Sequence, residues 1–241
     1  MADKHSFTSE ESLFAKLAEE PYIKDREAVF ALARTVHRGT AAVDKLVRAN
    51  GKLILEAAFA AVRENRKDCA NMPMAALTTR ARSGFVRAIY RFNKRSGKRI
   101  GEFSRIDVQR AVVRTGIDPN THELAKPDRE HLAMFRSKSK AKKMSAATEA
   151  ALIRHAQEGQ RALETLVTRN TRLVLGMANR SHSKMPAWDR FSEGRMGLMI
   201  AIDKFEPDRG FAISTYATHW IRQAINRSMN DQGRLIRIPV H

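Results

Sequence analysis

The stretch DKFEPDRGFAISTYATHWIRQAINRSM, residues 203–229, joins a turn to a strongly patterned helix. Pro207 and Gly210 mark the turn, and Ser214 is placed to cap the N-terminus of the helix that follows. Along that helix, aromatic, amide and basic side chains recur at steps of three and four residues, a spacing that puts them on one face. They are Tyr216, His219, Trp220, Gln223, Asn226 and Arg227.

The chemistry of this face fits DNA that is part duplex and part single strand. Aromatic rings stack on unpaired bases for about 1–3 kcal/mol each, and Gln and Asn amides pair with base edges. Arg227, Arg234 and Arg237 carry the charge that suits phosphates. The alternative is that Tyr216 and Trp220 lie in a buried seam of the core, the commoner fate of aromatic residues at helical spacing.

Composition limits the classes of protein to consider. The 241 residues suffice for one large or two small domains, and the net charge of +18 predicts a polyanionic partner, most simply nucleic acid. The single cysteine, Cys69, excludes an internal disulfide and fits a reducing compartment. Without an apolar run of membrane-span length or a signal-peptide core, the protein is expected to be cytoplasmic, with no membrane partner.

Candidate catalytic and metal sites are poor. His182 and Cys69 have no second ligand or catalytic partner at a recognisable spacing. Asp203 and Glu206 are explained as charges at a helix end and in a turn rather than as a catalytic pair. We therefore expect neither an enzyme activity nor a bound metal or cofactor.

The fold class that the sequence predicts is all-α. Helical periodicity dominates, strand-like alternation is nearly absent, and Gly and Pro fall between the periodic segments. A basic, loop-rich linker over 114–144 contains Pro119, Pro127 and the run RSKSKAKK. It separates two expected helical domains, 1–113 and 145–241.

The two expected domains repeat one another loosely. GTAAVDKLVRANGKLIL (39–55) matches GQRALETLVTRNTRLVL (159–175), and after a seven-residue insertion in the first copy the match resumes at a second constant offset. In the second block Gly84, Phe92 and Ala111 fall on Gly197, Phe205 and Ala224. This pattern predicts an internal duplication. The alternative is that unrelated amphipathic helices share small and apolar residues at similar spacing.

The first copy lacks the stacking face of the second. Glu102, Asp107 and Arg110 stand where the second copy has Thr215, Trp220 and Gln223. Its most prominent feature is a nearly uninterrupted basic series, at 80, 82, 87, 91, 94, 95, 98, 99, 105 and 110. This series predicts a surface with sequence-independent affinity for DNA, and the alternative is an ordinary solvated helix face.

Residues 145–241 resemble region 2 of the primary-type sigma factors of bacterial RNA polymerase, running into the first residues of region 3. The resemblance rests on ALETLVTRNTRLVLGMA followed by GLM-A-DKF, STYAT-WIRQAI and RIPVH, in order and with the spacing of the family. It implies a helical domain that binds a coiled coil of the polymerase β′ subunit. It also implies that this domain recognises and melts the promoter −10 element.

The resemblance implies a role for each residue at the −10 element. By position, Tyr216 is similar to the residue that stacks beside an adenine flipped out of the non-template strand. His219 and Trp220 fall on an aromatic pair that props the last intact base pair, and Gln223 and Asn226 on positions that read that pair. Further positions of this site fall on Phe211, Ile213 and Thr215 around the flipped adenine, and on Asn170 and Leu173 at a second flipped base.

The polymerase-binding positions implied by the resemblance are Asp189, Ser192, Glu193, Arg195, Met196 and Met199. Ser192 and Arg195 stand where the family usually has Gln and Asn, and Arg195 adds positive charge to a surface that is usually acidic. This departure predicts altered docking on β′. His219 stands where the family usually has Trp, and its smaller ring predicts a weaker wedge at the edge of the duplex.

These features predict a sigma-type transcription initiation factor that acts with RNA polymerase at the bacterial nucleoid. The rival interpretation is a regulator that occupies the sigma site on the polymerase without starting transcription. Because the chain stops at His241, before the rest of region 3 and region 4, we expect either a truncated chain or a protein partner that carries those regions and reads the −35 element. This division resembles that of the alphaproteobacterial activators of gene transfer agents.

Overall fold

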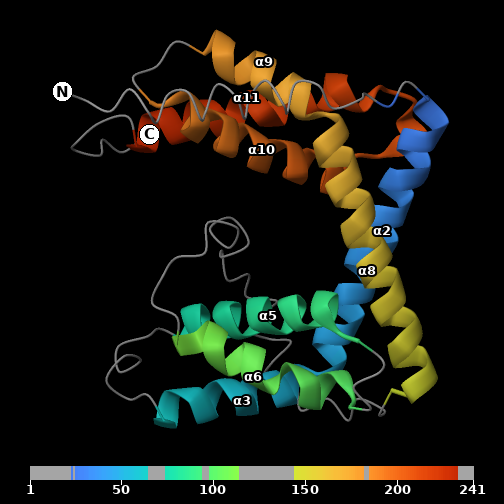
Figure 1. Ribbon diagram of the computed structural model, residues 1–241, viewed down its shortest axis with the longest axis vertical. Helices are drawn as coiled ribbons and strands as arrows, with labels where there is room; N and C mark the ends of the chain where they lie inside the picture. The colour runs from blue at the N-terminus through green and yellow to red at the C-terminus, as the bar shows by residue number, and fades with distance from the viewer. Residues whose placement is uncertain are drawn as a thin grey trace. The chain divides into compact units, whose positions relative to one another are not determined.

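The computed structural model describes residues 23, 25–64, 74–93, 98–113, 144–181 and 185–232. Within these ranges the chain forms eight α-helices, one short 3-10 helix and no strand, which confirms the predicted all-α fold. The expected linker lies outside the described residues except for Met144. In chain order (Figure 1) the helices are α2 (Arg26–Ala49), α3 (Gly51–Glu64), α5 (Met74–Arg91), α6 (Ile100–Val113), α8 (Ala146–Arg169), α9 (Thr171–Arg180), α10 (Ala187–Lys204), η3 (Pro207–Arg209) and α11 (Ile213–Gln232).

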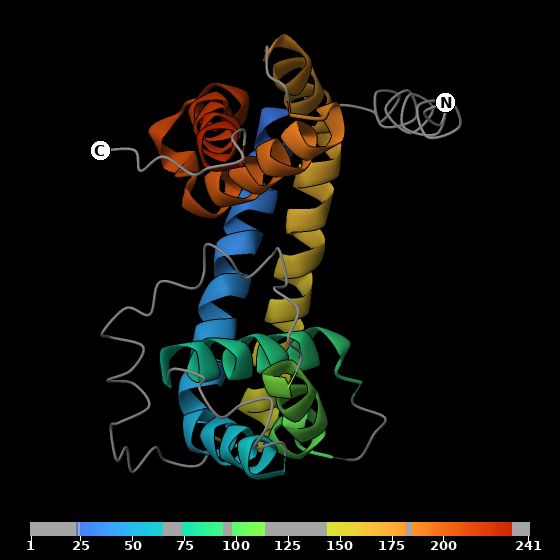
Figure 2. The same ribbon diagram turned by 90° about the vertical axis from the view of Figure 1, so that its left-hand side faces the viewer.

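The helices form two compact units, and the long helices α2 and α8 contribute to both. Unit 1 contains the described residues up to His37 and those from Arg161 onward, and unit 2 runs from Arg38 to Gln160. Figure 2 shows α2 and α8 each as one continuous helix. Each compact unit therefore contains the first half of the other unit's long helix. The domain division expected at 114–144 instead follows the order of the two copies along the chain.

Unit 1 has its core between α8, α9, α10 and α11. Leu166, Leu198, Ile202 and Ile221 are fully buried in this core, and Phe205 is 2% exposed. The first half of α2 adds Val29, Phe30, Ala33 and Val36 to the same core. Since burial of one large apolar side chain contributes about 1.5–3 kcal/mol, residues 26–37 are an integral part of unit 1.

Unit 2 is built in the same way from α3, α5, α6 and the second half of α2. Leu46, Ile54, Phe85, Ile89 and Val108 are fully buried or nearly so. The first half of α8 contributes Ile153 and Ala156 to this core. Each unit thus consists of the second half of its own long helix, three further helices and the first half of the other long helix.

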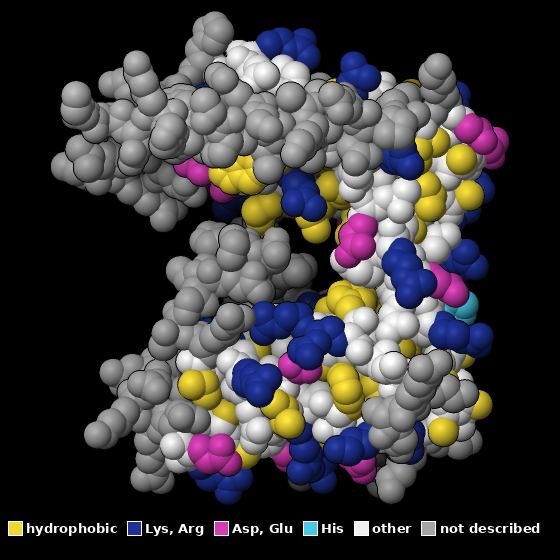
Figure 3. All heavy atoms as spheres, in the orientation of Figure 1, with side chains coloured by type: hydrophobic (Ala, Val, Ile, Leu, Met, Phe, Trp, Pro, Cys, Tyr) yellow, Lys and Arg dark blue, Asp and Glu magenta, His cyan; other side chains and the backbone are white. Residues whose placement is uncertain are grey.

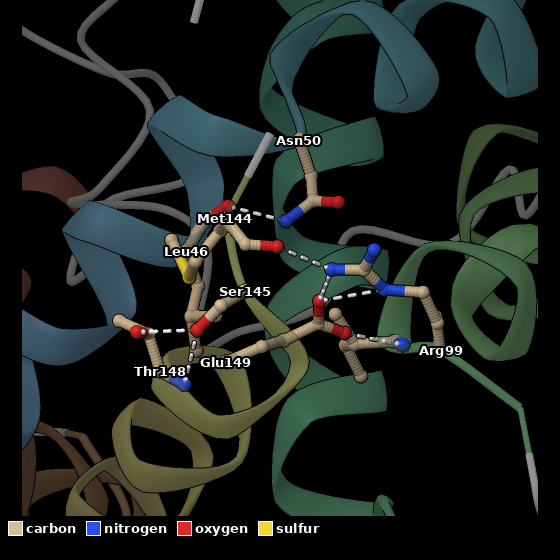
Figure 4. A network of polar contacts seen from close by, with 8 residues as sticks. Leu46, Asn50, Arg99, Met144, Ser145, Thr148 and Glu149 are labelled. Carbon is tan, nitrogen blue, oxygen red and sulfur yellow. Dashed lines mark hydrogen bonds and ion pairs between the residues drawn. The ribbon is translucent and has the colours of Figure 1, made fainter. Parts of the chain in front are cut away.

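A buried carboxylate fixes the start of α6 in unit 2. Glu149, from α8, is 7% exposed and accepts a hydrogen bond from the Ile100 amide at 2.9 Å. The Arg99 guanidinium donates to the same carboxylate through Nε at 3.0 Å and to the Met144 carbonyl at 2.8 Å (Figure 4). The first amides of a helix lack intrahelical partners, so this carboxylate acts as a cap supplied by another helix.

The helix boundaries of the two copies coincide at two constant offsets. The bounds of α2 and α8 are both related by 120 residues, as are the first residues of α3 and α9. The bounds of α5 and α10 are both related by 113 residues, as are the first residues of α6 and α11. These are the offsets at which the sequences match, so the structure supports the hypothesis of an internal duplication.

Equivalent glycines make equivalent contacts in the two copies. A Cβ on Gly84 would lie 2.6 Å from the Asp107 carbonyl oxygen, and a Cβ on Gly197 would lie 2.6 Å from the equivalent oxygen, that of Trp220. Only glycine lets the helix backbones approach this closely. The backbones of α5 and α6, and those of α10 and α11, therefore meet at the same place in each copy.

Candidate nucleic-acid interface

A tight turn leads the chain from α10 into α11. Gly210 follows η3 and has a φ of 73°, in the left-handed region that glycine adopts without strain. Two amides near the start of α11, those of Thr215 and Tyr216, donate to the Ala212 carbonyl at 3.1 and 3.3 Å. Ala212 is therefore the N-cap residue of α11.

The prediction that Ser214 caps this helix is wrong. The helix begins at Ile213, so Ser214 lies within its first turn. Ile213 is 3% exposed and belongs to the core of unit 1. The helix begins two residues earlier than a cap at Ser214 would place it, since Thr215 would then be its first residue.

Helix α11 has one buried stripe and one solvent face. The buried stripe recurs every three or four residues and consists of Ile213, Ala217, Ile221, Ile225 and Ser228. The predicted polar residues all lie on the exposed side, at Thr215, His219, Gln223, Asn226 and Arg227. The exposed side of α11 thus carries the amide and basic groups that the sequence pattern indicates.

The two large rings of α11 lie at the border between the stripe and the solvent face. Tyr216 and Trp220 are half-buried, with ring centroids 6.3 Å apart. The Tyr216 ring rests against the buried Phe205 at 5.9 Å, and Lys204 Nζ lies 4.2 Å from the centroid of the Trp220 ring. Each ring therefore packs on the core with part of its surface and exposes the rest. This arrangement is intermediate between the two alternatives considered for these rings, an exposed face that stacks on bases and a buried seam of the core.

An ion pair and a ring contact join the first half of α2 to the turn before α11. The Arg34 guanidinium donates to the Asp208 carboxylate at 2.8 Å, and this hydrogen bond raises the pKa of Arg34 above its ordinary value. Phe30 packs against Phe205 with ring centroids 6.0 Å apart. Phe205 in turn supports Tyr216, so α2 reaches the rings of α11 through one intermediate side chain.

Comparison with known proteins identifies this part of the chain. Residues 166–235 match the family model of sigma-70 region 2. The RNA polymerase principal sigma factor HrdD of Streptomyces griseus is 51% identical over 85 residues, which are 35% of this chain and 26% of that protein. The RNA polymerase sigma factor RpoD of Helicobacter pylori is 51% identical over 82 residues, 34% of this chain and 12% of that protein.

Residues 166–235 are similar to sigma-70 region 2. The predicted resemblance to region 2 of primary-type sigma factors is thereby confirmed for this part of the chain. The chain spans about a quarter or less of the length of the curated relatives it matches.

Within region 2, the residues expected to bind polymerase follow one side of α10. Asp189 and Arg195 are exposed, and the others are partly exposed at steps of three and four residues, at Ser192, Glu193, Met196 and Met199. The opposite side of α10 packs into the core through Phe191, Leu198 and Ile202. The stripe is therefore mixed in chemistry, with two carboxylates, one guanidinium and two thioethers.

Other predicted residues lie away from the solvent face of α11. Asn170 is 3% exposed at the junction of α8 and α9, and its side-chain amide donates to the Leu166 carbonyl at 2.7 Å. Leu173 packs partly against the core, whereas Phe211 is 63% exposed in the turn. Arg234 and Arg237 lie outside the described residues.

Sequence reasoning missed Lys204 and Phe205 as supports of the two rings. They lie on the preceding helix and turn, so no spacing rule along α11 points to them. The internal repeat does carry a signal, because the positions equivalent to Lys204 and Trp220 are Arg91 and Asp107. Those two residues also contact each other, as an ion pair with a nitrogen–oxygen distance of 3.0 Å.

Two other features, a metal-binding cluster and a membrane-spanning helix, are absent from the described residues. No group of three or more His, Cys, Asp or Glu side chains in these ranges is arranged to hold a metal ion. None of the described helices is both long and apolar enough to cross a membrane.

Proposed function

We propose that this chain is a sigma-type transcription initiation factor of the bacterial cytoplasm. It binds core RNA polymerase through α10 and recognises and melts the promoter −10 element through α11. The observation that carries the proposal is the surface of α11 in a region 2 domain, where two half-buried rings border an exposed face of amide and basic groups.

The order of groups along α11 suits the junction between duplex and single strand. Tyr216 and Gln223 are seven residues apart, about 10 Å along the helix, so stacking and base-edge contacts fall at different points of the DNA. Gln223 and Asn226 meet base pairs that are still formed. Arg227 meets a phosphate near the same end.

The magnitudes agree with strand separation by these rings. Unstacking and unpairing a base costs a few kcal/mol, and each aromatic stack returns about 1–3 kcal/mol. Tyr216 and Trp220 together thus offset the opening of about one or two base pairs. His219 supplies a smaller stacking surface, so the polymerase and the remaining contacts contribute the rest.

Docking on the polymerase rests on the stripe of α10. Asp189 and Glu193 provide the negative charge for a basic coiled coil, and Met196 and Met199 provide adaptable apolar surface. Arg195 places a cation in the same stripe, which lowers the affinity for a basic partner or selects a different contact on it.

Run-off transcription by core polymerase tests this function. Core polymerase is mixed with the full chain and with genomic fragments from the same organism. The expected result is initiation at discrete sites that depends on the chain and is lost with Tyr216→Ala. Tyr216→Phe is the matched control, because it keeps the ring and should keep the activity.

A second candidate is a regulator that occupies the sigma site without initiating. The observations that favour it are Arg195 on the docking stripe and the smaller ring of His219 on α11. It predicts firm binding to core polymerase, no chain-dependent initiation and a reduced yield when a complete sigma factor competes. The same transcription assay therefore separates the two candidates.

A further inference from the structure

A line of arginines runs along one side of α5 in unit 2. α5 contains Arg80, Arg82, Arg87 and Arg91 and no acidic residue. Arg80, Arg87 and Arg91 are seven and four residues apart, so they share one side of the helix. Arg82 lies elsewhere on the helix and donates to the Asp44 carboxylate of α2 at 2.9 Å. In the space-filling view, Lys and Arg side chains gather over α5 (Figure 3).

This line lies against α6, which adds a fourth arginine. Arg80 donates to the Val112 carbonyl at 3.3 Å, and Arg91 donates to the Asp107 carboxylate at 3.0 Å. Arg110 is exposed and lies one turn after Asp107 on α6. We call Arg80, Arg87, Arg91 and Arg110 the arginine ridge.

The ion pair of Arg91 with Asp107 does not consume the capacity of Arg91 for anions. The side chain of Arg91 is 67% exposed, whereas that of Asp107 is only 16% exposed. A guanidinium carries five N–H donors in a planar fork. The bond through Nη1 to Asp107 therefore leaves Arg91 with donors directed at solvent, and Asp107 fixes the orientation of the fork.

The ridge lies on α5 and α6, the helices of unit 2 that correspond to α10 and α11 in unit 1. At the constant offset of the repeat, Arg91 and Arg110 correspond to Lys204 and Gln223. The ring positions are changed, because Asp107 corresponds to Trp220 and the 58% exposed Ile106 to His219. Groups that stack on unpaired bases are thus replaced by an ion pair and an aliphatic side chain, while the amide of Gln223 is replaced by the guanidinium of Arg110.

The positions of α5 that correspond to the polymerase-binding stripe of α10 carry different chemical groups. Asp189 and Glu193 correspond to Ala76 and Arg80, so the two carboxylates are replaced by a methyl group and a guanidinium. A surface without acidic groups does not suit a basic coiled coil. Unit 2 is therefore directed at a polyanion rather than at the polymerase surface expected for region 2.

We infer that the arginine ridge binds the phosphate backbone of duplex DNA without reading its sequence. Arg80 to Arg91 spans about 16 Å of helix, a length along which a duplex presents several phosphates. Arginine forks bind phosphates by paired hydrogen bonds. This affinity is independent of the polymerase and of melting by region 2.

Equilibrium binding of the full chain to a short duplex of mixed sequence, without polymerase, tests this inference. Fluorescence anisotropy is measured over a range of salt concentrations for the wild type and for the triple variant Arg87→Gln/Arg91→Gln/Arg110→Gln. The slope of log affinity against log salt should become shallower by about 1 for each phosphate that the variant no longer neutralises. The matched control is Lys45→Gln/Arg48→Gln/Arg63→Gln, which removes the same charge from exposed positions of α2 and α3.

Three results overturn the inference. They are an absence of affinity for duplex DNA at low salt, a salt slope unchanged in the ridge variant, or an equal loss in the control variant. The first result would indicate that the ridge binds an acidic protein surface instead of DNA. Replacing the same three arginines by lysine guards against misfolding, because lysine keeps the charge and should retain most of the slope.

Discussion

Replacement of Trp220 by alanine should weaken the binding of forked DNA by the complex of this chain with core polymerase. The half-buried ring lies 6.3 Å from that of Tyr216, with Lys204 Nζ 4.2 Å from its centroid. Alanine removes both the surface on which a base or base pair stacks and the partner of the lysine. The backbone of α11 is unaffected, because Ala is the best helix former.

The expected loss follows from the stacking energy. One aromatic stack is worth about 1–3 kcal/mol, which corresponds to about a 5- to 150-fold lower affinity. Lys204→Gln removes only the cation–π contact, worth about 0.5–1 kcal/mol at an exposed site, so the loss should be about 2- to 5-fold. Trp220→Phe keeps a ring and should lie near the wild type.

The assay is fluorescence anisotropy with a labelled duplex that ends in a single-stranded extension. A fully paired duplex of the same sequence serves as the control DNA, and affinity for core polymerase is measured separately. Equal affinity of Trp220→Ala and wild type for the fork would refute the stacking role. A parallel loss on the fork and on the paired duplex would instead indicate a general structural effect.

The remaining predictions concern docking and stability. Asp189→Lys, and less strongly Glu193→Lys, should weaken binding to core polymerase, because like charges placed across an interface cost several kcal/mol; co-purification with β′ measures this. Gly39→Ala should lower the melting temperature, because its Cβ would lie 2.6 Å from the backbone of α8 and overpacking costs about 1–3 kcal/mol. Gly176→Ala, where only the end of a flexible side chain lies near at 3.4 Å, should raise it, since Ala is favoured over Gly in a helix by about 1 kcal/mol. Glu149→Gln should cost about 1–3 kcal/mol in a denaturation titration, because the Arg99 and Ile100 donors lose a buried carboxylate.

Helical periodicity was enough to predict the class of fold and the exposed face of α11. Apolar residues at Ile213, Ala217, Ile221 and Ile225 define the buried stripe, and the polar residues then fall opposite it by geometry. The position of the helix start was not predictable from polar capping rules, because the residue before it is Ala212, whose side chain has no capping group. The half-buried state of Trp220 was not predictable either, because it depends on packing against the core.

Contacts between helices cannot be predicted from the periodicity of a single helix. The start of α6 is capped by Glu149 of α8, which lies 49 residues from Ile100 in the chain. Capping rules consider residues next to the helix start, so they do not point to Glu149. The predicted basic series is not a uniform solvated face in the structure, because Arg82, Arg91 and Arg99 all bond to carboxylates of other helices. Their side chains also differ in exposure, from 24% for Arg82 to 67% for Arg91. Lys94 and Arg95 of that series lie outside the described residues.

The central claim, that α11 opens promoter DNA when the chain is bound to polymerase, is tested most directly by permanganate mapping of unpaired thymines on genomic fragments. Core polymerase from the same organism is incubated with the wild-type chain or with Tyr216→Ala/Trp220→Ala. We expect reactive thymines at discrete sites with the wild type and none with the double variant, while both chains bind the polymerase equally. Binding of the wild-type chain to core polymerase without any reactive thymine would contradict the claim.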